Sequence, residues 1–323
     1  MTQERDWTSA AMDRRRFLQL CLASVACPAA AGVAHAEERA REASQGRGHF
    51  GAMQELAAGA VQPEGWLREY MSKQRDELGS KLPEISWPFT EAYWSGLETG
   101  ESWWPWEQKA YWIDGATRLA LVMQDEVLFH RTQAILGYTS QHADADGYLG
   151  PQFFKDPKGD EHRWPQNIFF RALMASAEAG VGPPDIAEAM RRHYLGDKAS
   201  YGLPERNIAN VEPMLWSYAQ TRDARLLALA ESSWAEYLHQ ETTAKPRYGD
   251  LSELRVYAAT PIDAHGVTYA EISKIPALLY LHTGKPEYLR FAQAAQDLRS
   301  SHAGRWHPLH VGVAPYADIA GFA

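Results

Sequence analysis

Residues 215–227 read LWSYAQTRDARLL, and residues 278–289 read LLYLHTGKPEYL. In both stretches a Tyr precedes a Thr by three residues, polar residues follow, and a new apolar pair comes after them. The two threonines, Thr221 and Thr283, are sixty-two residues apart. This pattern is typical of a helix, a tight polar turn and a second helix. A unit that recurs at this distance predicts a stack of helical hairpins.

The rest of the body has the same periodicity. Apolar residues recur at i, i+4, i+8 and i+11 from Trp112 to Met123, and almost no period-two alternation is present. Weaker copies of the hairpin surround residues 124–126 and 179–180. The sequence therefore predicts an all-α fold.

Stacked hairpins can form an open solenoid or a closed α/α toroid. Regular solenoids keep short connections, whereas three connections here are long and rich in Trp, Gly, Pro and His: residues 79–108, 138–167 and 239–270. In a toroid these loops would gather at one end. We therefore expect a toroid, and note that barrels of paired helices with elaborated loops are common among carbohydrate-active enzymes, which is an analogy of fold.

The composition narrows the function. The chain has 323 residues, 45% of them hydrophobic and 23% charged, which is typical of a globular protein. Its net charge of −9 disfavours nucleic acid as a partner. Twelve tryptophans outnumber ten phenylalanines, and six of the tryptophans lie between residues 87 and 112.

The first 36 residues resemble a twin-arginine export signal. Residues 13–19 read DRRRFLQ, an Ala-rich apolar stretch follows, and Ala34-His35-Ala36 has the small-x-small pattern of a cleavage site. The stretch is short and weakly hydrophobic for a membrane anchor, so we expect a periplasmic or secreted protein without stable membrane insertion after cleavage. Lipid attachment through Cys27 is disfavoured because Ser24 stands where an aliphatic residue is expected.

Cleavage after Ala36 would leave one domain, residues 37–323, without a cysteine, because Cys21 and Cys27 both precede the cut. Such a domain has no disulfide, no thiolate ligand for zinc and no Cys nucleophile.

One stretch, residues 103–115, concentrates candidate binding residues. If a helix begins near Pro105, four polar residues share one face at i, i+4, i+7 and i+11: Glu107, Tyr111, Asp114 and Arg118. Aromatic rings beside carboxylates suit sugars, whose C–H faces stack on rings while hydroxyls bind carboxylates. We expect Trp106 and Trp112 to join Glu107, Tyr111 and Asp114 in a sugar-binding site. The alternative is a surface pair, Asp114 with Arg118, and tryptophans in the core.

Three further groups precede or begin predicted helices. Trp164 and Asn167 form one, and Asn210 and Glu212 form another, and each could be capping chemistry or part of a sugar pocket. The third is His265, with Asp263 before it and Glu271 after it, and it could be a structural or a functional histidine.

Several stretches in order resemble glycoside hydrolase family 127, typified by β-L-arabinofuranosidases, over roughly residues 56 to 302. These stretches are residues 59–68, 107–115, 146–151, 210–213, 265–267 and 274–284. The resemblance implies an (α/α)6 barrel that binds sugar at its centre, and a retaining exo-hydrolase of L-arabinofuranose with a zinc-bound Cys nucleophile and a Glu acid/base. His265 matches the His of the family's His-Gly-Val segment, where a sugar contact is implied.

The chain departs from this family toward its C-terminus. Residues 317–321 read ADIAG where an Asp-Glu pair is expected, and the Cys segments that hold zinc are absent. About four hairpins and an N-terminal helix are also too few for six. We therefore expect an incomplete toroid truncated near the middle of the family's length, with no catalytic residue, metal ligand or cofactor in this chain.

Together these observations predict a glycoside hydrolase-like protein that acts on arabinose-containing glycans and is catalytically incomplete. Two alternatives stay open. One is a non-catalytic glycan-binding α/α toroid, and the other is a metal-free hydrolase or lyase that uses Glu107, Asp114 and His265.

Overall fold

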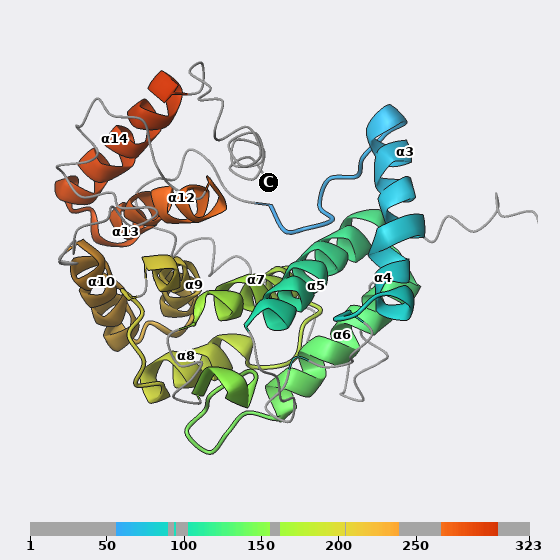
Figure 1. Cartoon of the computed structure of the whole chain (residues 1–323), viewed down its shortest axis with the longest axis horizontal. Coiled ribbons are helices and arrows are strands. Elements are labelled where there is room, and N and C mark those ends of the chain that lie inside the picture. The colour runs from blue at the N-terminus through green and yellow to red at the C-terminus, as the bar shows by residue number, and fades with distance from the viewer. Residues whose placement is uncertain are drawn as a thin grey trace, which may run out of the picture.

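A computed structural model describes residues 56–89, 94, 103–155, 162–203, 205–238 and 266–302 (Figure 1). All the regular secondary structure in these ranges is helical, which confirms the predicted all-α class for this part of the chain. The elements are α3 Gly65–Gln74, η1 Arg75–Gly79, α4 Ser80–Ile85, α5 Trp104–Met123, α6 Glu126–Gln141, η2 Gln152–Lys155, α7 Trp164–Glu178, α8 Ile186–Gly196, η3 Glu205–Asn210, α9 Val211–Thr221, α10 Ala224–Leu238, α12 Gly266–Ser273, α13 Ile275–Thr283 and α14 Pro286–His302.

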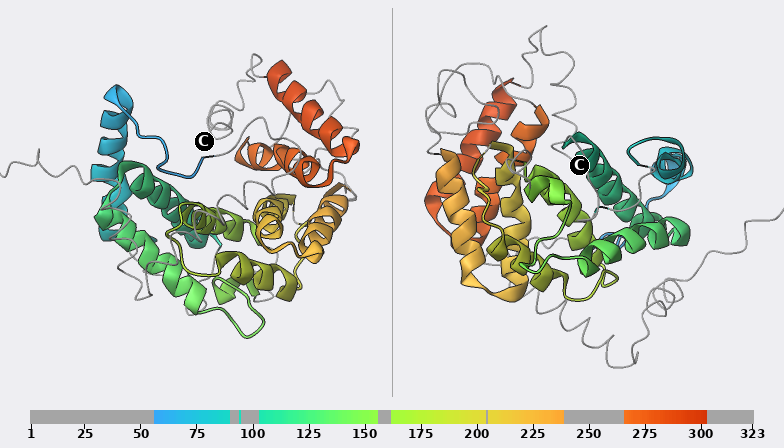
Figure 2. Two further views of the ribbon diagram at one scale, coloured as in Figure 1. Left: turned by 180° about the vertical axis from the view of Figure 1, so that it is seen from behind. Right: turned by 60° about the horizontal axis from the view of Figure 1, so that its bottom comes forward.

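Four hairpins lie where the sequence predicts them: α5 with α6, α7 with α8, α9 with α10, and α13 with α14. Helices α5, α7, α9 and α13 follow one another as neighbours, and α6, α8, α10 and α14 lie outside them (Figure 1). In Figure 1 and in the left view of Figure 2 the hairpins follow an arc, with α3 and α14 at its two ends. The predicted incomplete toroid stays a prediction.

Three of the four hairpins reverse direction in the same way. Gln124, Arg222 and Gly284 each follow the last residue of the first helix, adopt a left-handed conformation, and donate their N–H to the carbonyl four residues earlier. In the second hairpin, between α7 and α8, Gly180 has φ +72°. A left-handed residue satisfies a carbonyl at the helix end that would otherwise lack a partner.

Helices α5 and α7 run side by side in a constant register. Glu107 contacts Trp164, and Asp114 contacts Arg171, so that equivalent residues are fifty-seven positions apart at both places. The opposite face of α5 enters the core, where Trp94 stacks on Phe169 with ring centroids 4.3 Å apart. Two helices that keep one register hold the side chains of their shared face in a fixed row.

The segment from α3 to α4 is attached to this body through α5. The Trp112 indole N–H donates to the carbonyl of Gly79 at 3.0 Å. A Cβ on Gly59 would lie 2.6 Å from the carbonyl oxygen of Leu121, so only glycine allows this backbone approach. Among the helices described, none is long and apolar enough to cross a membrane.

Candidate functional site

Arg206 joins the inner helices. It lies in η3, and its guanidinium contacts Glu107 of α5 through Nη1 and Glu271 of α12 through Nε, the latter at 2.9 Å. Its Nη2 donates to the hydroxyl of Tyr111 at 2.7 Å, and that hydroxyl lies 3.4 Å from Glu271 Oε1. We call Glu107, Tyr111, Arg206 and Glu271 the inner charged cluster.

An indole completes one side of this cluster. Trp164, at the start of α7, donates from Nε1 to Glu107 Oε1 at 3.1 Å, and the Arg206 guanidinium lies 5.4 Å from its ring centroid. Trp103 packs edge-on against Trp164, with centroids 5.1 Å apart. A cation over an indole face and a carboxylate at the indole N–H fix the ring from two directions. The structure thus brings together three of the predicted residues: Glu107, Tyr111 and Trp164.

A second set of charges continues along the same face of α5. Asp114 accepts from Arg118 Nε at 2.8 Å, and its other oxygen lies 3.7 Å from Arg171 Nε. Burial alone would lower the pKa of Arg171, but the charges of Asp114, Glu212 and other acidic groups raise it. The guanidinium therefore stays charged. The predicted surface pair Asp114–Arg118 is real, and it lies beside the inner charged cluster rather than apart from it.

Glu212 belongs to this region through an ion pair. Its carboxylate lies 2.6 Å from Lys274 Nζ, and these residues come from the start of α9 and from the junction of α12 and α13. Burial would raise the pKa of Glu212, but the charges of Lys274 and Arg171 outweigh burial and lower it. The carboxylate is therefore ionised at neutral pH.

Asn167 lies between these two sets of charges. It is three residues after Trp164 and four before Arg171 on α7, a spacing that places all three on one helix face. The side chain is fully buried, and neither amide atom has a hydrogen-bond partner among the residues described. Such a group costs free energy unless something binds it. A bound water could satisfy both amide atoms of Asn167.

Asn210 has a different role from the predicted one. Its amide donates to the carbonyls of Arg163 and Asn207, and its oxygen accepts from Tyr194, so this fully buried side chain is satisfied within the protein. It makes no side-chain cap for α9. The prediction of a pocket-lining Asn210 is corrected because its donors and acceptor already hold three segments together.

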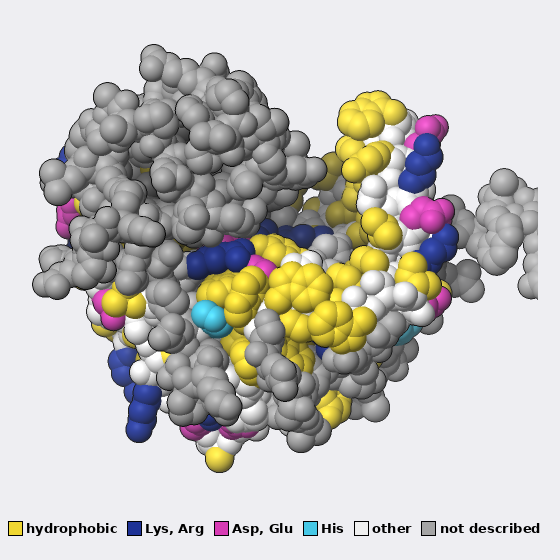
Figure 3. All heavy atoms as spheres, in the orientation of Figure 1, with side chains coloured by type: hydrophobic (Ala, Val, Ile, Leu, Met, Phe, Trp, Pro, Cys, Tyr) yellow, Lys and Arg dark blue, Asp and Glu magenta, His cyan; other side chains and the backbone are white. Residues whose placement is uncertain are grey.

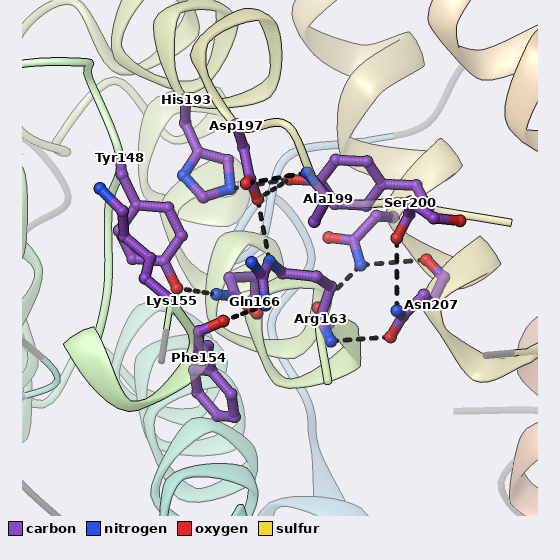
Figure 4. Close-up of polar contacts among 12 residues, drawn as sticks. Tyr148, Phe154, Lys155, Arg163, Gln166, His193, Asp197, Ala199, Ser200 and Asn207 are labelled. Carbon is purple, nitrogen blue, oxygen red and sulfur yellow. Dashed lines mark hydrogen bonds and ion pairs between the residues drawn. The ribbon is translucent and has the colours of Figure 1, made fainter. Parts of the chain in front are cut away.

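Figure 4 shows the buried network to which these contacts lead. Arg163 donates to Asp197 and, through its backbone N–H, to Asn207 Oδ1 at 2.7 Å. His193 accepts the N–H of Leu149 at Nδ1. The network fixes the residue that directly precedes Trp164 and so sets the position of that indole in the site.

Two predicted tryptophans lie elsewhere. Trp106 is buried in the core, where its carbonyl accepts from Trp94 Nε1, and Trp112 binds Gly79 and packs between α5 and the α3–α4 segment. The structure thus places neither ring in the inner charged cluster: Trp106 is rotated about 100° from Glu107 on α5, and the indole N–H of Trp112 donates to Gly79. His265 lies outside the described residues, so its predicted role stays a prediction.

Three basic residues of the site escaped the sequence analysis: Arg171, Arg206 and Lys274. Arg171 follows Trp164 by seven residues, so its place on the same helix face was available as a signal. Arg206 had none, since it lies ninety-nine residues from Glu107 and sixty-five from Glu271.

The site presents a mixed surface. Figure 3 shows hydrophobic side chains gathered over α5 and α7, with Lys or Arg and Asp or Glu side chains beside them. In the described ranges no three His, Cys, Asp or Glu side chains are grouped to hold a metal ion, so the zinc that the family resemblance implies has no ligand set there.

Comparison with known proteins gives no match: no family model, curated protein or solved structure is similar to this chain. Its function must therefore be argued from the residues and their geometry.

Proposed function

We propose that this protein binds arabinose-containing glycans on its inner face, as an exported α/α toroid of the glycoside hydrolase family 127 type. The observation that carries the proposal is Tyr111, a ring that is 37% exposed and whose hydroxyl is held by Arg206 beside Glu107 and Glu271. An exposed ring can stack on the C–H face of a sugar, and the charged groups at its edge suit the sugar's hydroxyls.

Pre-organisation supports the proposal. The side chains of the inner charged cluster hold one another in place, so a ligand need not order them when it binds. These features favour recognition of a polyhydroxylated ligand over a purely apolar one.

The ion pairs favour binding over bond cleavage by these residues. Retaining hydrolysis needs one carboxyl group that is protonated and one nucleophile, about 5 Å apart. In the inner face Glu107 and Glu271 share Arg206, Asp114 binds Arg118, and Glu212 binds Lys274. The charges of Lys274 and Arg171 lower the pKa of Glu212, so this carboxylate resists protonation. We therefore propose glycan binding as the activity of the described residues.

Calorimetry with an L-arabinofuranose disaccharide tests the proposal. The protein should release or take up heat at millimolar ligand, and Tyr111→Phe and Arg206→Gln should each weaken binding, the second by about tenfold or more because a charge-assisted hydrogen bond is worth about 1.5–3 kcal/mol. Glu231→Gln is the matched control, since Glu231 lies in α10 and binds Lys285 and Tyr288 at the start of α14.

Absence of binding by the unaltered protein at millimolar disaccharide would overturn the proposal. If Glu231→Gln weakened binding by the same factor, the loss of affinity in Arg206→Gln would come from reduced stability of the fold. A parallel assay with a synthetic β-L-arabinofuranoside separates the alternatives. Turnover that a zinc chelator abolishes would indicate the family's hydrolase chemistry, and chelator-resistant turnover lost in Asp114→Asn would indicate the metal-free enzyme.

A further inference from the structure

Two tryptophans lie exposed beside the inner face. Trp87 follows α4 and Trp104 is the first residue of α5, and their ring centroids are 5.6 Å apart with the planes tilted by 31°. Their exposed fractions are 56% and 42%. Two segments of the chain thus contribute to one aromatic surface, which we call the tryptophan pair.

The tryptophan pair continues into the inner charged cluster. Trp104 precedes Glu107 by three residues and Tyr111 by seven, so all three lie toward one side of α5. Tyr111 is itself 37% exposed, and its hydroxyl binds Arg206. Seven residues of helix rise about 10 Å, which is longer than one sugar ring. A ligand that reached from Tyr111 to Trp104 would therefore contain more than one sugar.

The residue types favour a glycan over other occupants of an exposed apolar surface. A tryptophan offers a flat face and one N–H donor, which suits a ligand that is apolar on one side and polar at its edges. Lipid or protein partners need broad apolar patches. Here the surface leads instead to the carboxylate of Glu107 and the guanidinium of Arg206, which bind hydroxyl groups.

We propose that Trp87 and Trp104 form a second sugar subsite, which binds an inner residue of an oligosaccharide whose end contacts the inner charged cluster. This inference rests on the proposed function and narrows the ligand to a chain of several sugars. The subsite acts by stacking, so it adds affinity for longer ligands and leaves the binding of a disaccharide at the inner cluster unchanged.

The test compares a short and a long probe. Binding of an L-arabinofuranose disaccharide and of a linear arabino-hexasaccharide is measured by calorimetry with the unaltered protein, Trp87→Ala and Trp104→Ala. We expect the hexasaccharide to bind more tightly, and each substitution to weaken it about tenfold without changing the disaccharide. Trp104→Tyr should recover part of the loss. Trp66→Ala, which removes a 77% exposed indole from α3, is the matched control.

Each other outcome counts against the inference in a distinct way. Equal affinity for both probes, or equal losses in Trp66→Ala, would overturn the subsite and leave the proposed function standing. Failure of both probes to bind would overturn the proposed function and the subsite together. Sedimentation velocity identifies the remaining occupant: a dimer that Trp104→Ala converts to monomers, with hexasaccharide binding unchanged, would assign the tryptophan pair to a second copy of the chain.

Discussion

Arg163 and Asp197 form a buried ion pair, with Nε and Oδ2 2.8 Å apart and only 3% and 7% of the two side chains exposed. Asp197 also accepts from Tyr201, and Arg163 donates to the carbonyl of Phe154. Burial would raise the pKa of Asp197, but its bonds to Arg163 lower it, so the carboxylate stays ionised. The pair connects the start of α7 to the end of α8, directly beside the indole of the candidate site.

Loss of Asp197 should therefore destabilise the fold. In Asp197→Ala the Arg163 guanidinium keeps its charge in a buried position without its partner, and we expect the free energy of unfolding to fall by about 3–5 kcal/mol. Urea unfolding followed by circular dichroism measures the change. Lys81→Ala is the control, because Lys81 and Glu77 form an exposed pair whose loss should cost about 0.5 kcal/mol or less. Similar costs for both variants would contradict the role of the buried pair.

His193 should make stability depend on pH. Its ring is fully buried, Nδ1 accepts the N–H of Leu149, and burial lowers the pKa of His193 to about 3 from an ordinary value of 6.5. Between these values the unfolded chain binds a proton that the folded chain does not, so acidification favours unfolding by up to about 1.4 kcal/mol per pH unit. The charged groups whose fields act on the ring are Asp197, Arg163, Asp146 and Lys155.

The comparison of interest is with His193→Asn, whose amide oxygen can accept the same N–H. Unfolding free energies are measured for both proteins from pH 7 to pH 4. Carboxylates titrate in both, so the difference in slope between the two proteins reports His193 alone. We expect the variant to lose less stability on acidification, and parallel slopes would show that the ring is protonated in the folded state.

Two glycines should respond in opposite ways to alanine. A Cβ on Gly196, the last residue of α8, would lie 2.1 Å from the carbonyl oxygen of Asp146, and Gly196→Ala should cost about 1–3 kcal/mol. A Cβ on Gly115, within α5, would meet nothing within 4 Å, and Gly115→Ala should stabilise by about 0.5–1 kcal/mol. Thermal unfolding of the two variants measures both changes in stability. A stabilised Gly196→Ala would mean that the end of α8 lies farther from the carbonyl of Asp146.

Arg206 should couple Glu107 and Glu271, which are far apart in the sequence. Arg206→Ala leaves Glu107 and Glu271 close together without their shared cation, and we expect a loss of about 3 kcal/mol in unfolding free energy. If repulsion between the carboxylates causes the loss, adding Glu107→Gln and Glu271→Gln should restore part of it. Strictly additive effects in this series would show that the three side chains do not interact.

The hairpins were predictable because their signals are local. A period of 3.6 residues and a polar turn are written within about fifteen residues, as between Tyr218 and Leu226 or between Tyr280 and Tyr288. The same periodicity placed Glu107, Tyr111 and Asp114 on one face of α5. The periodicity could not show which residues of other segments contact that face.

Arg206 illustrates why the rest of the site could not be predicted. It reaches Glu107 only because η3 carries it across the start of α7, and the sequence gives no periodic signal for a contact between segments so far apart. The positions of the tryptophans could not be predicted for another reason. Their composition suggested one cluster, but adjacent residues of a helix point about 100° apart, so Trp106 enters the core while Glu107 faces inward.

The left-handed residue at the turn of three hairpins has a further consequence. Gln124, Arg222 and Gly284 adopt φ values of 55°, 58° and 69°, although only one of them is a glycine. In each of these hairpins the chain therefore turns through one left-handed residue and one bond between its N–H and a backbone carbonyl. Neither contact uses a side chain, so the turn does not depend on which side chains the two helices carry. Substitutions on the inner helices can then change the charged face without altering the turns.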